Sequence, residues 1–398
     1  MFGISSTPIF KTMTRKLRMG MIGGGQDSFI GAVHRKAAAL DGEIDLVCGA
    51  FSSDPVKSRQ TGESLYLNPH RIYASFEEMI QKEKLLPSDQ RMDFVSIVTP
   101  NHVHFEPAKM ALENGFHVII DKPLAFSVAE AKTLKKVVEK TGLILALTHT
   151  YTGYPLVKEA RAAIAAGKIG KIRKVYVEYP QGWLSILKEK SGNRQASWRT
   201  DPKRSGAGGA IGDIGTHAAN LAEYITGLRI TEVNALLNTV VKGRKIDDDS
   251  SMLLRFDNGA TGVLLATQVA AGEENNLNIR IYGEKGGMEW KQEEPNTLLL
   301  KWLDRPKEVV RAGWFEYLSE EAKKNTRVPW GHPEGYFEAF ANIYLAFARA
   351  VRDFKPGKKI NAVKYDFPDV EDGVRGMAFV DTVIKSANSN RKWTPFKY

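Results

Sequence analysis

The 398-residue sequence has almost no cysteine and no long hydrophobic run. Its single cysteine, Cys48, lies in the apolar stretch IDLVCGAF, which excludes a disulfide within the chain and indicates a buried thiol. No apolar segment approaches the roughly 18 residues that a membrane span requires. The first residues lack a long apolar stretch followed by a small-residue cleavage site, which argues against secretion. These absences predict a cytoplasmic protein that does not enter a membrane.

Runs of five or more lysines and arginines are absent as well. The net charge is +10, but the 56 lysines and arginines are scattered among 46 acidic residues. This pattern argues against nucleic-acid binding and is compatible with attraction for a dinucleotide pyrophosphate or an anionic metabolite. His102 and His104 have no further cysteine or histidine cluster around them, so we expect no metal site.

The order of apolar segments predicts two domains, as the chain length also does. We expect a dinucleotide-binding Rossmann domain over residues 1–150, of which residues 1–16 form a disordered lead. Short apolar strands alternate there with amphipathic helices, which implies a parallel sheet with ligands at the carboxyl ends of its strands. The predicted strands are 17–23, 44–51, 94–99, 117–121 and 143–149.

After a linking helix near 154–170 the pattern changes to longer alternating strands. Residues 151–398 are predicted to form an α+β domain built on a mostly antiparallel open sheet, used for substrate binding and oligomerisation. Asn258-Gly259 is a strong hairpin signal. One sheet face has no helices to cover it, so we expect a homodimer or homotetramer. Terminal helices near 334–352 and 368–387 are expected to pack back on the body. The predicted strands are 172–179, 230–241, 250–270 and 278–290.

The glycine loop GMIGGGQDSFIG follows the first predicted strand. Gly23 and Gly25 match the opening of the G-x-G-x-x-G phosphate-binding motif, but Ser28 stands where the third glycine is due and the next glycine is Gly31. A plain tight turn is the alternative. Because the loop directly follows the first predicted strand, a modified dinucleotide loop is favoured. Its expected cofactor contacts are Gly23, Gly25, Gln26 and Ser28.

The end of the second strand, GAFSSDP, places Ser52 where an acidic residue would select NAD. A serine with Ser53, Lys57 and Arg59 nearby tolerates a 2′-phosphate. The cofactor is therefore predicted to be NAD or NADP, with a slight preference for NADP. An ordinary loop without a role in cofactor choice is the alternative for the GAFSSDP segment.

Two further segments carry candidate catalytic groups. In VIIDKPLAFS, Lys122 follows the end of a predicted strand, and a lysine beside a nicotinamide stabilises a developing alkoxide. A solvated Lys-Pro pair on the surface is the alternative. A cis peptide bond before Pro123 is plausible. In GGAIGDIGTHAANLAEYITG, a helical wheel places Asp213 one turn before His217, the arrangement of an oriented general base. A capping aspartate and a surface histidine are the alternative. The glycine run before Asp213 suggests close approach to a ligand.

Taken in order, these motifs resemble the glucose–fructose oxidoreductase / inositol dehydrogenase / MocA family from Leu17 to the C-terminus. Asp121-Lys122-Pro123 is similar to the family's Glu-Lys-Pro, and Asp213, Gly215 and His217 are similar to its Asp-x-Gly-x-x-His. TPNHVH resembles the family's Thr-Pro-Asn-x-x-His stretch. The resemblance implies cofactor contacts from Thr99, Asn101, His104, Asp121 and Lys122.

The resemblance also implies an NAD(P)-dependent oxidation of a secondary hydroxyl of a sugar, glycoside or cyclitol. In this scheme His217 removes the hydroxyl proton, Lys122 stabilises the alkoxide and Asp213 orients His217. Tyr151, Trp198, Arg199 and His217 are the expected substrate contacts, with His332 and Tyr336 as weaker candidates. The alternatives are an NAD-dependent glycosidase that acts by transient oxidation and elimination, and a non-catalytic dinucleotide sensor.

Overall fold

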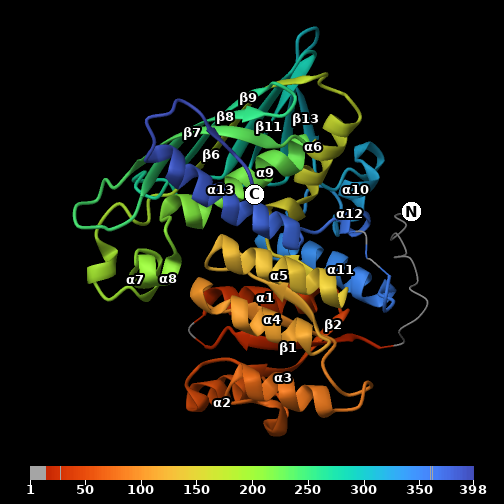
Figure 1. Cartoon of the computed structure of the whole chain (residues 1–398). Helices are drawn as coiled ribbons and strands as arrows, with labels where there is room; N and C mark the ends of the chain where they lie inside the picture. Colours follow the sequence, from red (N-terminus) through yellow and green to blue (C-terminus); the bar gives the residue numbers. More distant parts are fainter. Residues whose placement is uncertain (1–14, 27, 359, 361) are drawn as a thin grey trace.

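Figure 1 shows the computed structural model, in which residues 15–26, 28–358, 360 and 362–398 are described. The predicted disordered lead, residues 1–16, lies outside the described residues except for its last two. The first sheet and its helices form the lower half of Figure 1, and the second sheet forms the upper half.

The first sheet is a five-stranded parallel sheet in the order β2-β1-β3-β4-β5, which confirms the predicted Rossmann arrangement. Strands β3, β4 and β5 are buried along their whole length, as expected for a parallel sheet covered by helices on both faces. The elements are β1 (Leu17–Gly23), α1 (Phe29–Leu40), β2 (Ile44–Ala50), α2 (Pro55–Ser64), α3 (Phe76–Leu85), β3 (Phe94–Val98), α4 (Phe105–Glu113), β4 (His117–Ile120), α5 (Val128–Thr141) and β5 (Leu145–Leu147).

The second sheet has nine strands in the order β13-β12-β11-β10-β6-β9-β8-β7-β14. Only β6 and β9 pair in parallel, so the prediction of a mostly antiparallel sheet is confirmed. Asn258-Gly259 lies in the predicted hairpin turn, where Gly259 has a φ of +86°. The strands are β6 (Ile172–Pro180), β7 (Ile230–Asn238), β8 (Asp249–Phe256), β9 (Thr261–Thr267), β10 (Asn278–Gly283), β11 (Gly286–Lys291), β12 (Thr297–Trp302), β13 (Glu308–Arg311) and β14 (Thr394–Pro395).

The remaining helices include the two terminal ones that the sequence predicted. They are α6 (Pro155–Ala165), α7 (Arg194–Arg199), α8 (Pro202–Ser205), α9 (Thr216–Thr226), α10 (Glu320–Lys323), α11 (Tyr336–Asp353), α12 (Ala362–Tyr365) and α13 (Val370–Ala387). Helix α11 packs on α1 and on the first sheet, where Phe347 meets Phe94 with ring centroids 5.0 Å apart. Helix α13 packs on α5 and on β7, so it spans both domains. The prediction that these helices pack back on the body is confirmed.

Helix α11 completes the second layer of the first domain. Leu17, Met19 and Met21 of β1 face α1 and α11, whereas Ile22 faces the side covered by α3, α4 and α5. Cys48 lies fully buried on that second side, as predicted, and is a free thiol. The first sheet thus obtains one of its covering helices from the far end of the sequence.

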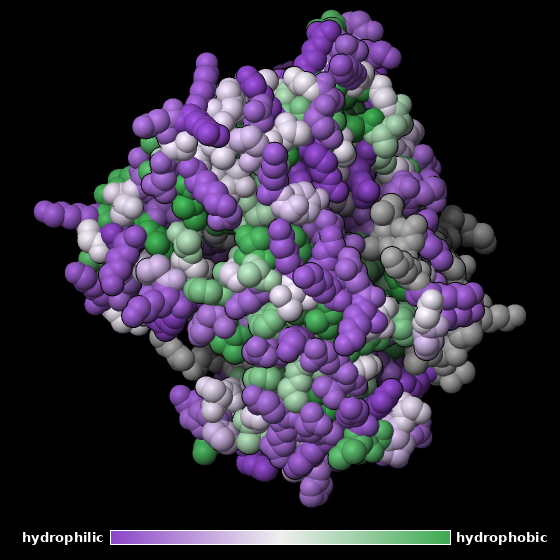
Figure 2. Space-filling model, viewed as in Figure 1, coloured by the Kyte–Doolittle hydropathy of each residue, from purple (hydrophilic) through white to green (hydrophobic). Residues whose placement is uncertain are grey.

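The second sheet has one row of residues that faces away from α6, α9 and α13. Strand register aligns Leu253, Val263, Tyr176, Arg280 and Val309 on this face, and 46% of Leu253 and 60% of Val309 are exposed. Subunit pairing through this face stays a prediction. Figure 2 shows the molecule from the side of α5 and α13, where the surface is mostly hydrophilic with small hydrophobic groups between the polar residues. Within the described part of the chain, no helix has the length and apolar character that crossing a membrane requires.

The interrupted glycine loop has a steric explanation. An ideal Cβ on Gly31 would lie 2.3 Å from the Cα of Gly24, closer than any real Cβ contact. Gly31 on α1 therefore provides the close helix–loop packing that the third glycine of a G-x-G-x-x-G motif provides. The insertion displaces this glycine by three positions without removing its function.

This packing predicts that Gly31→Ala destabilises the first domain. The added methyl group must displace backbone rather than a flexible side chain, which costs about 1–3 kcal/mol. Gly376→Ala is the matched control, because Gly376 also lies within a helix and its ideal Cβ has no neighbour closer than 3.9 Å. Urea unfolding should show a lower free energy of unfolding for Gly31→Ala and an equal or higher one for Gly376→Ala. Equal stability of the two variants would contradict the packing argument.

Candidate active site

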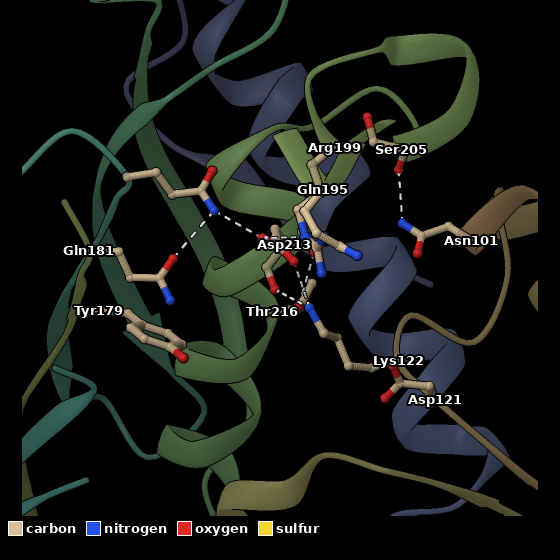
Figure 3. A network of polar contacts seen from close by, with 12 residues as sticks. Asn101, Asp121, Lys122, Tyr179, Gln181, Gln195, Arg199, Ser205, Asp213 and Thr216 are labelled. Atoms are coloured by element: carbon tan, nitrogen blue, oxygen red, sulfur yellow. Dashed lines mark hydrogen bonds and ion pairs between the residues drawn. The ribbon is translucent and has the colours of Figure 1, made fainter. Parts of the chain in front are cut away.

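The candidate site lies where the carboxyl ends of β3 and β4 face the carboxyl ends of β6 and β9. Figure 3 shows Lys122 from the first domain reaching Asp213 of the second, with Arg199 close to the same carboxylate. Gln181 lies farther away and is connected to Asp213 through Gln268. The predicted catalytic residues, more than ninety positions apart in the sequence, are thus brought together at the junction of the two sheets.

The glycine loop offers backbone groups at the N-terminus of α1. Gly23 and Gly24 have φ angles of +81° and +73°, a region that L side chains rarely adopt. Arg35 Nη1 donates to the carbonyl of Gly24 at 2.6 Å, and the Ser28 hydroxyl caps α1 by accepting from Gly31 N at 3.2 Å. The loop therefore presents N–H groups and a helix N-terminus to an anion, which fits a pyrophosphate. Gln26 is exposed on this loop.

Ser52 has a local structural contact at the end of β2. Its hydroxyl accepts from Asp54 N at 3.1 Å, and Asp54 in turn caps α2 by accepting from Val56 N at 2.9 Å. Arg59 lies 3.8 Å from Glu63 in an exposed ion pair. These contacts give no support to the preference for NADP over NAD that the sequence suggested.

The TPNHVH segment connects strand ends. His104 is buried, with Nδ1 2.6 Å from the carbonyl of Pro123 and Nε2 2.8 Å from the carbonyl of Thr99. His104 therefore holds the ends of β3 and β4 together, a supporting position rather than an open cofactor contact. Asn101 Nδ2 donates to the carbonyl of Ser205 at 3.2 Å, which links the cofactor side to α8 (Figure 3). Thr99 Oγ1 is buried without a partner among the described atoms.

Lys122 follows β4, and its peptide bond to Pro123 is cis. Its ammonium group donates to the carbonyl oxygen of Asp213 at 2.5 Å and to Oδ1 of the same residue at 2.9 Å. The preceding residue, Asp121, accepts from Thr148 Oγ1 at 2.8 Å and lies 3.8 Å from His34 Nε2. Burial raises the pKa of Asp121, but His34 and Lys122 lower it more, so this carboxylate is ionised at neutral pH.

Asp213 is the most heavily contacted group of the site. Besides Lys122, its Oδ2 accepts from Gln268 Nε2 at 2.9 Å and lies 3.4 Å from Arg199 Nε. Burial opposes ionisation of Asp213, but the charges of Lys122 and Arg199 outweigh it and lower the pKa well below its ordinary value. Asp213 thus holds a stable negative charge between two cations.

The expected hydrogen bond between Asp213 and His217 is not among the contacts of the described residues. The helical wheel assumed an α-helix, but Ile211–Gly215 is a π-helical turn, in which Thr216 N bonds to the carbonyl of Ile211 five residues earlier. This register directs the Asp213 carboxylate towards Lys122 and Gln268 instead. Asp213 acts on His217 through its charge, which raises the pKa of that imidazole.

His217 is buried and has a second histidine beside it. The ring of His149 lies 5.4 Å from that of His217 at 83°, and the Tyr151 ring lies 4.9 Å from it on another side. Burial and the charge of Lys122 lower the pKa of His149 to about 3 and that of His217 well below its ordinary value. Both imidazoles are therefore neutral at pH 7. Nδ1 of each ring is buried without a partner among the described residues.

Sequence reasoning did not identify the polar side chains that the second sheet contributes. Gln181 follows β6 and Gln268 follows β9, and because these strands are parallel neighbours both residues emerge at the same edge. Gln268 Nε2 lies 3.4 Å from Gln181 Oε1, and Gln181 Nε2 donates to Asn275 Oδ1 at 2.6 Å. Tyr179 donates to the same Asn275 oxygen at 2.8 Å. The sequence does show a glutamine directly after β6 and another after β9. It does not show that these two strands are neighbours in the sheet, which is what brings the glutamines together.

The predicted substrate residues divide into two groups. The Tyr151 hydroxyl is bonded to Tyr179 and accepts from Asn275 Nδ2 at 3.3 Å, so Tyr151 belongs to this polar wall. The Arg199 guanidinium lies 4.2 Å from the centroid of the Trp198 ring and 6.0 Å from that of Trp183. Trp198 and Arg199 therefore flank Asp213 on the side of α7.

The two weaker candidates, His332 and Tyr336, have surroundings that differ from each other. His332 is exposed, and its Nδ1 lies 3.3 Å from the backbone carbonyls of Pro329 and Trp330. Tyr336 packs against Phe29 and Phe340, with ring centroids 6.5 Å and 5.1 Å apart, and burial together with the charges of Tyr151 and Asp121 raises the pKa of its hydroxyl well above the ordinary value. Tyr336 is therefore near enough to the site to interact electrostatically with it. Tyr224, farther along α9 than His217, donates to Asp366 at 2.9 Å and so belongs to a separate cluster.

Comparisons with known proteins identify the family and the fold. A family model described as the oxidoreductase family, NAD-binding Rossmann fold, matches residues 17–149, and one described as the GFO/IDH/MocA C-terminal domain matches residues 157–289. The uncharacterized oxidoreductase YfiI of Bacillus subtilis (strain 168) is 32% identical over 97% of this chain and 98% of its own length. Levoglucosan dehydrogenase of Pseudarthrobacter phenanthrenivorans is 29% identical over 71% of this chain and 76% of its own length.

Among solved structures, an inositol dehydrogenase homolog from Azotobacter vinelandii complexed with NAD⁺ superposes with a TM-score of 0.89 at 33% identity. The match covers 96% of this chain and 98% of that one. A second structure of an inositol dehydrogenase homolog from Azotobacter vinelandii, complexed with NADH and myo-inositol, superposes with a TM-score of 0.87 at 32% identity.

The depressed histidine pKa values give a test of the site electrostatics. Lys122→Met removes a positive charge that disfavours protonation of His149 and His217, so the pKa of both should rise. The titration of ¹³Cε1-labelled histidines by NMR measures this change. His117 is an internal control, because burial lowers its pKa to about 4 without a contribution from Lys122. If His149 and His217 titrate as in the wild type, Lys122 does not set the charge state of the site.

Proposed function

Because this chain belongs to the GFO/IDH/MocA family of oxidoreductases, we propose that it is an NAD-dependent dehydrogenase that oxidises a secondary hydroxyl of a sugar, glycoside or cyclitol. Two of its relatives are named levoglucosan dehydrogenase and scyllo-inositol 2-dehydrogenase (NAD(+)). The observation that carries the proposal is the Lys122–Asp213 ion pair beside a neutral, buried His217.

The first domain has groups that fit a dinucleotide. The loop of Gly23, Gly24 and Gly25 and the N-terminus of α1 would hold the pyrophosphate, since a glycine turn that leads into a helix N-terminus offers backbone N–H groups to an anion. An ideal Cβ on Gly24 would lie 2.9 Å from Val98 Cγ2, and the φ of +73° disfavours any L side chain there, so the loop is closely packed at this glycine. The unpartnered hydroxyl of Thr99 is a further candidate contact. When bound, NAD supplies the hydride acceptor of the reaction.

The residues of the site have complementary tasks in such an oxidation. His217 is neutral and accepts the hydroxyl proton at Nε2, since Nδ1 is the nitrogen buried without a partner. The Lys122 ammonium stabilises the negative charge that develops on the substrate oxygen. Asp213 holds Lys122 in place through two contacts, at 2.5 Å and 2.9 Å. Gln181, Gln268 and Asn275 are amides able to bond to the remaining hydroxyls of a polyol.

Binding to the cofactor is tested by thermal unfolding. A ligand that binds only the folded state stabilises it by about 2.7 kcal/mol at a concentration of 100 Kd, so millimolar NAD⁺ or NADH should raise Tm. NADP⁺ should raise Tm less, because Ser52 is engaged with Asp54 and the Asp54 carboxylate lies at the same turn. The absence of a shift with either cofactor would exclude the dinucleotide site, and a larger shift with NADP⁺ would favour NADP.

The catalytic roles are tested by Lys122→Met and His217→Ala. Each should lower kcat with a responsive sugar or cyclitol by about 10²–10⁴, the usual effect of losing an acid–base group or an alkoxide-stabilising group. The double variant should lose less than the product of the two single losses, because both groups act on one hydroxyl. NADH production measures turnover, and cofactor affinity should change little.

Lys132→Met is the matched control, since Lys132 is an exposed lysine on α5. Near wild-type turnover in Lys122→Met would remove Lys122 from the mechanism. Release of an aglycone without net NADH would instead support the glycosidase alternative, and cofactor binding without turnover of any polyol would support the sensor.

A further inference from the structure

The loop between β7 and β8, residues 239–248, contacts the turn that carries Asp213. Asp247 on this loop is 8% exposed, and its carboxylate accepts from Gly209 N at 2.6 Å and from Ile211 N at 2.8 Å. Its main-chain carbonyl accepts from Ala210 N at 2.9 Å. Asp247 therefore binds three consecutive N–H groups at the start of the π-helical turn Ile211–Gly215.

The glycines before Asp213 are explained by the same contact. An ideal Cβ on Gly209 would lie 1.9 Å from the carbonyl oxygen of Asp247, a distance that no side chain can occupy. On Gly208 it would lie 2.8 Å from the Cγ2 of Ile211. The expectation that this glycine run allows close approach to a ligand is therefore corrected for Gly208 and Gly209: these two residues make room for the protein's own side chain and backbone.

The loop that carries Asp247 is itself firmly held. Its neighbour Asp248 accepts from Val240 N at 2.7 Å and Val241 N at 2.9 Å, and Arg244 donates to the same carboxylate at 2.9 Å. The side chains of Arg244 and Asp248 are each 1% exposed. The carbonyl of Asp248 also accepts from Gln268 N at 2.8 Å, so the loop is attached to a second residue of the site.

Asp213 lies only two residues after Ile211, and both its carbonyl and its carboxylate bind Lys122. A displacement of about 1 Å between reacting groups costs about 10²-fold in rate. We propose that Asp247 is a positioning residue that places the π-helical turn so that Asp213 meets Lys122. This inference rests on the proposed dehydrogenase activity. The hydrogen bonds of the Asp247 carboxylate go to Gly209 N and Ile211 N of the turn, not to Lys122 or the glycine loop.

Asp247→Asn tests the inference, because the amide retains one acceptor oxygen and replaces the other by a donor. We expect kcat with a responsive sugar to fall by about 10²-fold. The KM for the sugar and the affinity for NAD should change less than about threefold, since a positioning residue acts on the transition state rather than on binding. The pH dependence of kcat should also change, because the charges of Lys122 and Asp213 act, after burial, on the pKa of His217.

Asp369→Asn is the matched control. Asp369 is also an aspartate that caps a helix, and it accepts from Glu371 N at 2.8 Å and Asp372 N at 3.3 Å, but α13 carries none of the catalytic residues. Its loss of thermal stability should resemble that of Asp247→Asn, whereas its kcat and pH profile should equal those of the wild type. If both variants keep wild-type kcat and pH profile, Asp247 has only a structural role and the inference is wrong.

An NMR measurement separates this inference from the proposed function. The ¹³Cε1 resonance of His217 should move in Asp247→Asn and stay unchanged in Asp369→Asn, whether or not any sugar is turned over. Gly209→Ala retains the Asp247 carboxylate, but its added methyl group displaces the main-chain carbonyl of Asp247 from the turn, so it should move the same resonance. This variant replaces Asp247→Asn in the test if Asp247→Asn does not fold. A wild-type enzyme inactive on all polyols would overturn the function alone. An unmoved His217 resonance in the folded variant would overturn the positioning role alone.

Discussion

The ion pair between Lys122 and Asp213 connects the two domains at the point where the chemistry is proposed to occur. Lys122 follows a strand of the first sheet, and Asp213 lies on a turn beside the second sheet. The two side chains are 15% and 21% exposed, so both charges have lost much of their hydration. Such a pair is retained only with good geometry and additional hydrogen bonds, which the Asp213 carbonyl, Gln268 and Arg199 supply.

The same ion pair determines the protonation states around it. The positive charge of Lys122 adds to burial in keeping His149 and His217 neutral, while it helps to keep Asp121 and Asp213 ionised. A neutral imidazole next to an ammonium group is the combination that accepts a proton and stabilises an alkoxide at neutral pH. One lysine thus has two effects, a direct one on substrate charge and an indirect one on the base.

The polar side chains on the second-domain side of the site are brought together by one parallel strand pair in the second sheet. Strands β6 and β9 are the one parallel pair in an otherwise antiparallel sheet, and their carboxyl ends therefore lie together. Gln181 and Gln268 follow these ends, and Asn275 and Tyr179 continue the network to Tyr151. The amides and hydroxyls of these side chains are the groups that a polyhydroxylated substrate requires, and they come from segments far apart in the sequence.

The sequence by itself determined the elements that depend on local pattern. The five strands of the first sheet, the hairpin at Asn258-Gly259, the terminal helices and the buried Cys48 all follow from hydrophobic periodicity and turn residues, which act over a few positions. The motifs around Lys122, Asp213 and His217 were identified for the same reason. The glycine loop was identified as well, although the packing of Gly31 on Gly24 was not.

Only the tertiary structure decided the contacts between distant segments. An α-helical wheel predicted that Asp213 faces His217, but Asp247 binds the preceding turn, the turn is π-helical, and Asp213 contacts Lys122 instead. The parallel pairing of β6 with β9 and the covering of the first sheet by α11 were likewise unpredictable. The physical reason is the same in each case: these arrangements depend on long-range packing and hydrogen bonds, which outweigh the local preferences that a sequence pattern records.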